Sequence, residues 1–246
     1  MDTVVPSELA IFLIGTFAAA FVTGVAGFAF GLIAAAIWLY ALTPVQTTSL
    51  LVGYGLLVQG YAVWKLRHTL NAKRLIPLIL GSAVGVPFGI VLLRWVSPAH
   101  LRMAIGVLLI LFSLYNLVRP KLPEVKGGGQ AADAGVGFLN GVVGGSTGLA
   151  GILIVIWSNM RGWARDEQRA AFQPTGVATF LITLVTLGGA GIITEDTLEL
   201  FALGLPALAI GTWVGWKLYG RLDEASFRKG VLVLLLISGV ALALRG

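Results

Sequence analysis

Cysteine and charged residues are what this sequence has least of. The 246-residue chain contains no cysteine, which excludes disulfide bonds, thiolate metal sites and cysteine nucleophiles. Only 11% of its residues are charged, against about 25% in soluble domains, while 57% are hydrophobic. Water could not solvate a surface of that composition, so the sequence predicts an all-α polytopic membrane protein.

Ionisable side chains are also missing from the middle of the apolar segments. Asp, Glu, Lys, Arg and His inside a membrane are the usual proton relays and charge partners. Their absence argues against a carboxylate-based proton cycle, a membrane hydrolase and a metalloenzyme. We therefore expect a protein that is not an enzyme and that needs no metal and no cofactor.

Apolar segments fill almost the whole chain, and a membrane-spanning helix needs about 20 such residues. Eight segments can be recognised, at about residues 9–42, 45–64, 75–96, 101–118, 134–157, 170–187, 198–219 and 231–244. The one linker-like stretch, 119–132, is rich in proline, glycine and charge, which is typical of a mobile connection. The chain is predicted to consist of an N-terminal repeat at 1–118, a cytoplasmic linker at 119–132 and a C-terminal repeat at 133–246.

Two glycine-rich stretches interrupt apolar segments where a helix would otherwise continue. They are 21–31 (FVTGVAGFAFG) and 138–148 (FLNGVVGGSTG), and their phenylalanine and three of their glycines match at one constant offset. Further along, a pair of glycines, Gly85 and Gly89, matches Gly211 and Gly215 in the second half. Elements that recur in the same order indicate an internal duplication.

Positive charge indicates how the two repeats are oriented, since Lys and Arg concentrate in cytoplasmic loops. If every segment crossed the membrane once, the basic residues would be shared almost equally between the two sides. If the first and fifth segments instead fold back at their glycine breaks, one side receives every Lys and Arg except Arg94, Arg102 and Arg245. The sequence thus predicts two inverted repeats, each a glycine-broken hairpin segment followed by three transmembrane helices, with both termini in the periplasm.

Inverted repeats with discontinuous helices are a common plan for transporters. Half-helix N-termini point their free N–H groups and positive dipole ends at an anion near the membrane midplane, and glycine lets an anion approach the main chain. The polar starts of the second and sixth segments are expected to line the same cavity. The candidate substrate-binding residues are Gly24, Gly27, Gly31, Thr48, Ser49, Asn140, Gly141, Gly144, Gly145, Ser146, Thr147, Gly148, Gln173 and Thr175.

A plainer interpretation exists for each of these residue types. Glycines at four-residue spacing also fit close helix packing, and this is the preferred interpretation for Gly81, Gly85 and Gly89, on the view that nothing polar accompanies them. Ser and Thr in membrane helices often bond only the carbonyl four residues earlier.

The duplicated motif resembles the sulfite exporter TauE/SafE family. The resemblance rests on Gly24-x2-Gly27-x3-Gly31, on Asn140-Gly-x2-Gly-Gly-Ser-Thr-Gly148 and on Thr48-Ser49, and it covers nearly the whole chain. It implies export or uptake of sulfite, thiosulfate or organosulfonates such as sulfoacetate across the bacterial inner membrane. In the second half, Gln173-Pro174 stands where a Thr-Ser-like pair is expected.

The leading hypothesis is a multi-pass inner-membrane transporter that exports small sulfur-containing anions by alternating access at a midplane site between two glycine-broken helices. A channel-like permeator of another small anion or solute is the alternative, and a non-transporting membrane scaffold is a third hypothesis. The expected partners are a small anionic substrate and the lipid bilayer, with a homo-oligomer left open. Nucleic acid is not expected, because cytoplasmic loops account for the net charge of +6.

Overall fold

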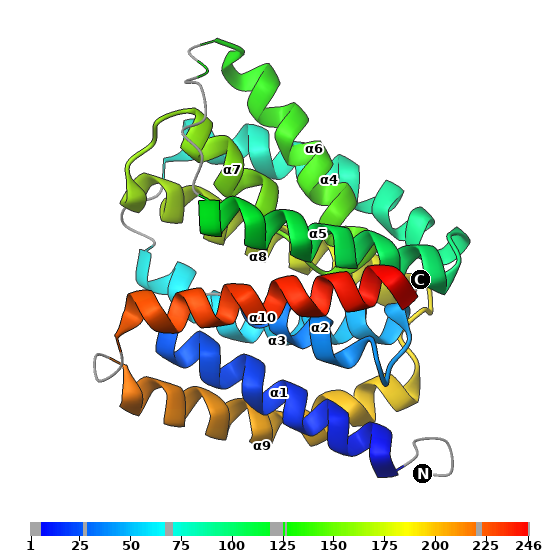
Figure 1. Ribbon diagram of the computed structural model, residues 1–246. Helices are drawn as coiled ribbons and strands as arrows, with labels where there is room; N and C mark the ends of the chain where they lie inside the picture. The colour runs from blue at the N-terminus through cyan, green and yellow to red at the C-terminus, as the bar shows by residue number, and fades with distance from the viewer. Residues whose placement is uncertain are drawn as a thin grey trace. The chain divides into compact units, whose positions relative to one another are not determined.

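Helices are the only regular elements in the part of the chain that the computed structural model describes, residues 6–26, 29–66, 71–118, 125, 127–219 and 223–245 (Figure 1). They are α1 (Pro6–Ala26), α2 (Phe30–Trp38), α3 (Pro44–Leu66), α4 (Ala72–Trp95), α5 (Pro98–Val118), α6 (Gly129–Thr147), α7 (Ile152–Met160), α8 (Arg165–Gly189), α9 (Glu195–Leu218) and α10 (Glu224–Arg245). Within these residues, six helices are long and apolar enough to cross a membrane: α1, α4, α5, α8, α9 and α10. The prediction of an all-helical, multi-pass membrane protein is confirmed.

Both segments with a glycine-rich stretch are interrupted. The first gives α1 and α2, with Ala29 in the left-handed region at φ 75°. The second gives α6 and α7, joined by residues 148–151, with φ 72° at Gly148 and 100° at Gly151. The second break lies later than the sequence predicted, because 138–147 remains helical. Gly27 lies outside the described residues.

Each short helix folds back along the helix before it. Trp38, the last residue of α2, donates its Nε1–H to the Phe12 carbonyl of α1 at 3.2 Å, and the two rings lie 5.2 Å apart. In the second break, Trp157 of α7 donates its Nε1–H to Asp133 Oδ1 near the start of α6, at 2.8 Å. Nine residues of α-helix span about 14 Å, so each short helix covers less than half of a hydrocarbon layer of about 30 Å.

The helix lengths of the two halves follow the same order. The first five helices contain 21, 9, 23, 24 and 21 residues, and the last five contain 19, 9, 25, 24 and 22. Both nine-residue helices also begin at a residue with positive φ and no side-chain cap. This recurrence supports the internal duplication that the glycine motif indicates.

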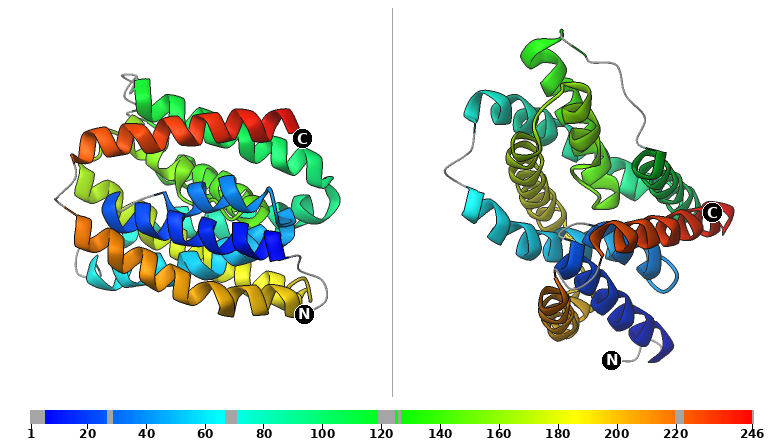
Figure 2. Two further views of the ribbon diagram at one scale, coloured as in Figure 1. Left: turned by 60° about the horizontal axis from the view of Figure 1, so that its bottom comes forward. Right: turned by 60° about the vertical axis from the view of Figure 1, so that its left-hand side comes forward.

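The helices form two compact units, and each unit combines helices from both halves of the sequence. The first unit consists of Met1–Thr47, Val96–Pro120 and Thr194–Gly246, and the second of Thr48–Trp95 and Lys121–Ile193. In the first unit α1 packs on α9 and α5 packs on α10, as Figure 2 shows from two sides. In the second unit the largest helix contact joins α4 to α6. The halves therefore exchange partners, because α1 and α4 of the first half each pack on a helix of the second.

Glycine explains how closely α4 and α6 approach. A Cβ added to Gly81, Gly85 or Gly89 of α4 would lie 2.1 to 2.3 Å from a carbonyl oxygen of α6. The reverse holds for Gly137 and Gly141 of α6, whose added Cβ would lie 2.3 and 2.2 Å from carbonyl oxygens of α4. Small-residue packing of this kind is the main means by which membrane helices associate, so the packing interpretation of the α4 glycines is confirmed.

Candidate functional site

The break between α6 and α7 lies inside the second unit and is held by Asn140. Its side chain is 1% exposed. Its Oδ1 accepts from the Gly151 N–H at 2.7 Å, while its Nδ2 donates to Ser82 Oγ and to Thr179 Oγ1, each at 3.3 Å. One residue of α6 thus joins α4, α8 and the start of α7, and it fixes the position where α7 begins.

The first turn of α7 leaves main-chain N–H groups without a partner in their own helix. The first intrahelical bond runs from the Val155 N–H to the Gly151 carbonyl, at 3.0 Å. The N–H groups of Ile152, Leu153 and Ile154 precede it, and α-helix geometry gives them no partner within the helix. No side chain caps this terminus. The positive end of the α7 dipole therefore lies at the break.

The N–H groups of the residues between α6 and α7 form hydrogen bonds at the C-terminus of α6. The Gly148 N–H donates to the Gly144 carbonyl at 2.9 Å, and the Leu149 N–H donates to Thr147 Oγ1 at 3.2 Å. Gly148 adopts φ 72°, and a Cβ there would lie 2.8 Å from Leu51 Cβ of α3. Both the conformation and the space around this position require glycine.

The hydroxyl groups predicted to bind an anion mostly donate to main-chain carbonyls. Thr147 Oγ1 donates to the Val143 carbonyl at 2.7 Å, Ser146 Oγ to the Val142 carbonyl at 2.8 Å and Thr175 Oγ1 to the Ala171 carbonyl at 2.8 Å. Thr48 Oγ1 of α3 makes a longer contact with the Ser146 carbonyl, at 3.4 Å. These hydroxyls have to break their bonds to carbonyls before they can donate to a ligand. The first main-chain N–H groups of α7 have no such bond within their helix to break.

The structure divides the candidate residues of the second unit into two sets. Gly141 and Gly145 face the backbone of α4, where an added Cβ would lie 2.2 and 2.6 Å from a carbonyl oxygen. Gly144 faces the break, because its added Cβ would meet Thr179 Cγ2 at 2.7 Å and Ala150 Cβ at 3.2 Å. The set around the break comprises Thr48, Asn140, Gly144, Ser146, Thr147 and Gly148, while Thr175 of α8 bonds only within its own helix.

Two further candidates of the second unit lie beside this set. Ser49 follows Thr48 on α3 and is 5% exposed. Gln173 lies on α8 two residues before Thr175, and its Oε1 is buried without a hydrogen-bond partner among the described residues.

The candidates in the first break belong to the first unit. Gly24 faces α9, where an added Cβ would lie 2.7 Å from the Thr212 carbonyl oxygen and 3.0 Å from Gly215 Cα. Gly31 is the second residue of α2. Gly24 is thus a packing position, while Gly31 lies in the first turn of α2, at the place that Leu153 occupies in α7.

Sequence reasoning missed Ser82 and Asp133. Ser82 is 0% exposed on α4 and accepts from Asn140, but in the sequence it stands unremarked among packing glycines. Asp133 is 5% exposed at the edge of the fifth apolar segment and accepts from Trp157. Asp133 could have been found from the sequence, because it is an acidic residue at the edge of an apolar segment. Ser82 could not, because only the contact between α4 and α6 brings it to Asn140.

The set around the break contains no ionisable group, so its donors are neutral. Across the described residues there is also no group of His, Cys, Asp or Glu that could hold a metal ion. A site of this kind can partly desolvate a small anion against N–H dipoles and release it again, because no buried cation traps it.

The profile of a family described as "Sulfite exporter TauE/SafE" matches residues 11–242. The chain is also similar to a protein from Sinorhizobium sp. called "Probable membrane transporter protein ORF9", with 26% identity over 247 residues, covering 96% of this chain and 91% of the relative. No solved structure matches the chain significantly.

Proposed function

Because the chain belongs to the sulfite exporter TauE/SafE family and is a membrane transporter, we propose that it exports small sulfur-containing anions across the bacterial inner membrane. Sulfite, thiosulfate and organosulfonates such as sulfoacetate are the substrate class. The anion binds where a broken helix begins near the membrane midplane, and the protein works by alternating access.

The observation that carries this proposal is the uncapped start of α7 within the second unit. Three consecutive N–H groups follow the left-handed Gly151, and Asn140 holds that residue in place. Backbone N–H groups at a helix N-terminus bind sulfate, phosphate and carboxylate groups without a charged side chain. A sulfite or sulfonate group presents the same kind of oxygens to the same kind of donors.

The start of α2 supports a matching anion-binding position in the first unit. Like α7, this helix has nine residues and begins at a residue with positive φ and no side-chain cap. In transporters built from repeats, the ends of discontinuous helices point at the substrate. We assign Gly31 to the anion-binding position at the start of α2, and Gly144, Gly148 and Asn140 to the anion-binding position at the start of α7.

Charge supports a cytoplasmic position for one end of the first unit. The end of α1 lies beside the start of α10 through the Phe21 and Phe227 rings, and Arg228 Nη2 of α10 donates to Asn116 Oδ1 near the end of α5 at 2.9 Å. Lys217 and Lys229 belong to the same helix ends. The starts of α1 and α9 carry acidic residues instead: Glu8, Glu195, Asp196 and Glu199.

The second unit is oriented by its own charges in the same way. Its helices α4, α6 and α8 run in one direction, as the Asn140 contacts with Ser82 and Thr179 and the Arg74–Glu167 ion pair require. Basic residues gather where these helices begin: Lys73, Arg74, Arg161 and Arg169. Applied to each unit, the positive-inside bias gives cytoplasmic loops at 65–74, 119–132, 159–169 and 217–229, inverted repeats and periplasmic termini.

Cysteine labelling tests this topology in a chain that has no native thiol. A single cysteine in place of Gln130 or Ala164 is expected to stay unlabelled by an impermeant maleimide applied to intact cells. Both should be labelled after the membrane is opened. Labelling of either from outside would contradict the proposed orientation.

An outward direction needs no second energy source. A membrane potential that is negative inside favours outward movement of an anion by about 2.3 kcal/mol per charge per 100 mV. Among the described residues, Asp133 is the one acidic side chain that is buried, and its Oδ1 accepts from Trp157 rather than from a second acid. Electrogenic export by alternating access is the mechanism that fits both observations.

Flux measurements in proteoliposomes test the proposal against its channel-like alternative. Vesicles loaded with sulfite, thiosulfate or sulfoacetate should release the anion faster than protein-free vesicles, and an imposed potential should change the rate. Chloride and formate should neither move at a comparable rate nor compete. Equal flux of chloride and formate would favour a channel-like permeator, and absence of sulfur-anion flux would exclude the proposed substrate class.

A further inference from the structure

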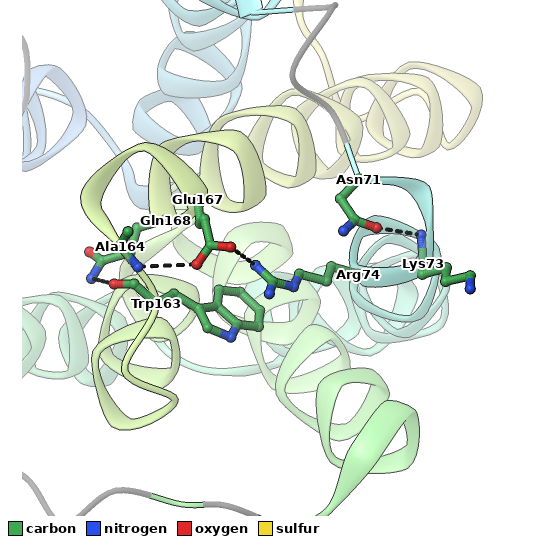
Figure 3. Close-up of polar contacts among 7 residues, drawn as sticks. All are labelled: Asn71, Lys73, Arg74, Trp163, Ala164, Glu167 and Gln168. Carbon is green, nitrogen blue, oxygen red and sulfur yellow. Dashed lines mark hydrogen bonds and ion pairs between the residues drawn. The ribbon is translucent and has the colours of Figure 1, made fainter.

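A small cavity lies at the end of the second unit where α4 and α8 begin. Its volume is about 130 Å³, and it is lined by Asn71, Arg74, Leu75, Glu167, Ala170 and Ala171. Figure 3 shows Arg74 reaching from α4 toward Glu167 of α8, and an ion pair joins Arg74 Nη1 to Glu167 Oε1 at 2.9 Å. The cavity is separate from the break between α6 and α7 and shares no residue with it.

Arg74 is held in place by stacking as well as by charge. Its guanidinium carbon lies 4.7 Å from the centroid of the Trp163 ring. Trp163 is itself 8% exposed and packs with Leu78, Ile154 and Ala171. The guanidinium carries five N–H donors, and its contact with the Trp163 ring does not use them as hydrogen-bond donors to a side-chain oxygen. The ion pair with Glu167 uses one nitrogen of the guanidinium.

Glu167 does not depend on Arg74 for a hydrogen-bond partner. Its Oε2 accepts from the Ala164 N–H at 3.1 Å, which closes the first turn of α8. The two charged side chains are 34% and 46% exposed, and ion pairs at that exposure contribute little to stability. An incoming oxyanion can therefore replace Glu167 at Arg74 at small cost, and Glu167 keeps the helix-capping bond.

The cavity lies on the same face of α8 as the contacts at the break. Glu167, Ala171, Thr175 and Thr179 follow one another at four-residue spacing, so they form one stripe along the helix. Thr179 is the residue that contacts Asn140. The apolar cluster of Leu78, Ile154, Trp163 and Ala171 stands between the two. A solute in the cavity is thus one apolar layer away from the Asn140 contacts.

We propose that this cavity, the Arg74 vestibule, is a second oxyanion-binding site. Arg74 binds the transported anion on the side of the membrane where the 119–132 linker lies (the linker side), before the anion reaches the break. The inference rests on the proposed function for the identity of its ligand. At about 130 Å³ the cavity is large enough for a sulfur atom with three oxygens. The planar fork of arginine bonds two oxygens of such a group at once, which lysine cannot do.

The test compares Arg74→Gln with Arg169→Gln, a matched control that removes an equal charge from α8 outside the cavity. Sulfite is supplied from either side of oriented proteoliposomes, and the half-saturating concentration is measured on each side. Arg74→Gln should raise that concentration roughly tenfold on the linker side, as expected for loss of a charge-assisted pair, and leave the other side within about twofold. Arg169→Gln should change neither. Equal effects of the two variants, or equal effects on both sides, would overturn the inference.

The double variant Arg74→Glu with Glu167→Arg exchanges the two charges and distinguishes two roles of the pair, a structural ion pair and a binding site. If the pair only ties α4 to α8, the exchange restores the wild-type half-saturating concentration, and the inference is overturned. If Arg74 binds the anion on the Trp163 ring, the concentration stays raised in the exchanged variant. Glu167→Gln, which removes the competing carboxylate, should lower it.

Two further arms identify the ligand and separate this inference from the proposed function. Vesicles of zwitterionic lipid should give the same Arg74→Gln effect as vesicles with anionic lipid, and an effect confined to anionic lipid would assign the vestibule to a headgroup. Thermal unfolding with added sulfite reports binding even without flux. If the wild type moves no sulfite, the proposed function fails, while a sulfite-induced stabilisation that Arg74→Gln abolishes and Arg169→Gln retains still supports the vestibule.

Discussion

Asn140→Ala removes the acceptor that holds the Gly151 N–H and so tests how the start of α7 is kept in place. Ser82 Oγ and Thr179 Oγ1 keep their own bonds to the Gly137 and Thr175 carbonyls after the substitution. The main loss is therefore the buried bond to Gly151, at 2.7 Å. An unsatisfied buried donor costs about 1–3 kcal/mol, and the small cavity left by the amide adds to it.

The expected loss of stability is about 2–4 kcal/mol, which lowers the midpoint of thermal unfolding by roughly 5–15 °C in a chain of this size. Asn140→Asp is the matched control, because it keeps an acceptor for the Gly151 N–H. It places a carboxylate oxygen against Ser82 Oγ and Thr179 Oγ1, so its unfolding midpoint should also fall, and it should lose sulfite flux, since a carboxylate beside the α7 N-terminus repels an anion. Unchanged unfolding and flux in Asn140→Ala would refute the role assigned to this residue.

Three other substitutions follow from the geometry of the second unit. Gly85→Ala should destabilise the protein by more than about 2 kcal/mol, because its Cβ would lie 2.1 Å from the Phe138 carbonyl oxygen, whereas Gly135→Ala, with no atom within 4 Å, should be nearly neutral in thermal unfolding. Gly148→Ala should cost about 1–2 kcal/mol from its left-handed backbone alone, measured in the same way. Trp157→Phe should lose about 1 kcal/mol with the bond to Asp133, and an unchanged unfolding midpoint would show that this bond does not fix α7 to α6.

The two broken helices could be predicted from sequence because their cause is local. An apolar stretch too long for one crossing, repeated glycine and a repeated motif all occur within short windows. The position of the second break could not be predicted, because Gly141 and Gly145 belong to a helix whose glycines are stabilised by contact with α4. In the sequence those two glycines look the same as Gly148, which does break the helix.

The exchange of partners between the two halves depends on contacts far apart in the chain. The glycines of α4 pack against the glycines of α6, and this packing requires that the glycine positions in both helices match.

The hydrogen-bond partners of the hydroxyl groups also depend on the fold. Ser146, Thr147 and Thr175 are donors by residue type, but the fold engages their hydrogens with carbonyls four residues earlier. The sequence could therefore indicate the neighbourhood of the candidate site and its main-chain N–H groups, while the structure was needed to show that these hydroxyls already donate to carbonyls.

A crystal structure with selenite, a heavier analogue of sulfite, tests the central claim most directly, because selenium can be located by its anomalous scattering. The account predicts a selenium peak at the start of α7, with selenite oxygens about 2.7–3.2 Å from the N–H groups of Ile152, Leu153 or Ile154. Occupancy at that position should fall when thiosulfate or sulfoacetate is added in excess. A saturating concentration of selenite that leaves the start of α7 empty would contradict the claim that the broken helix binds the transported anion.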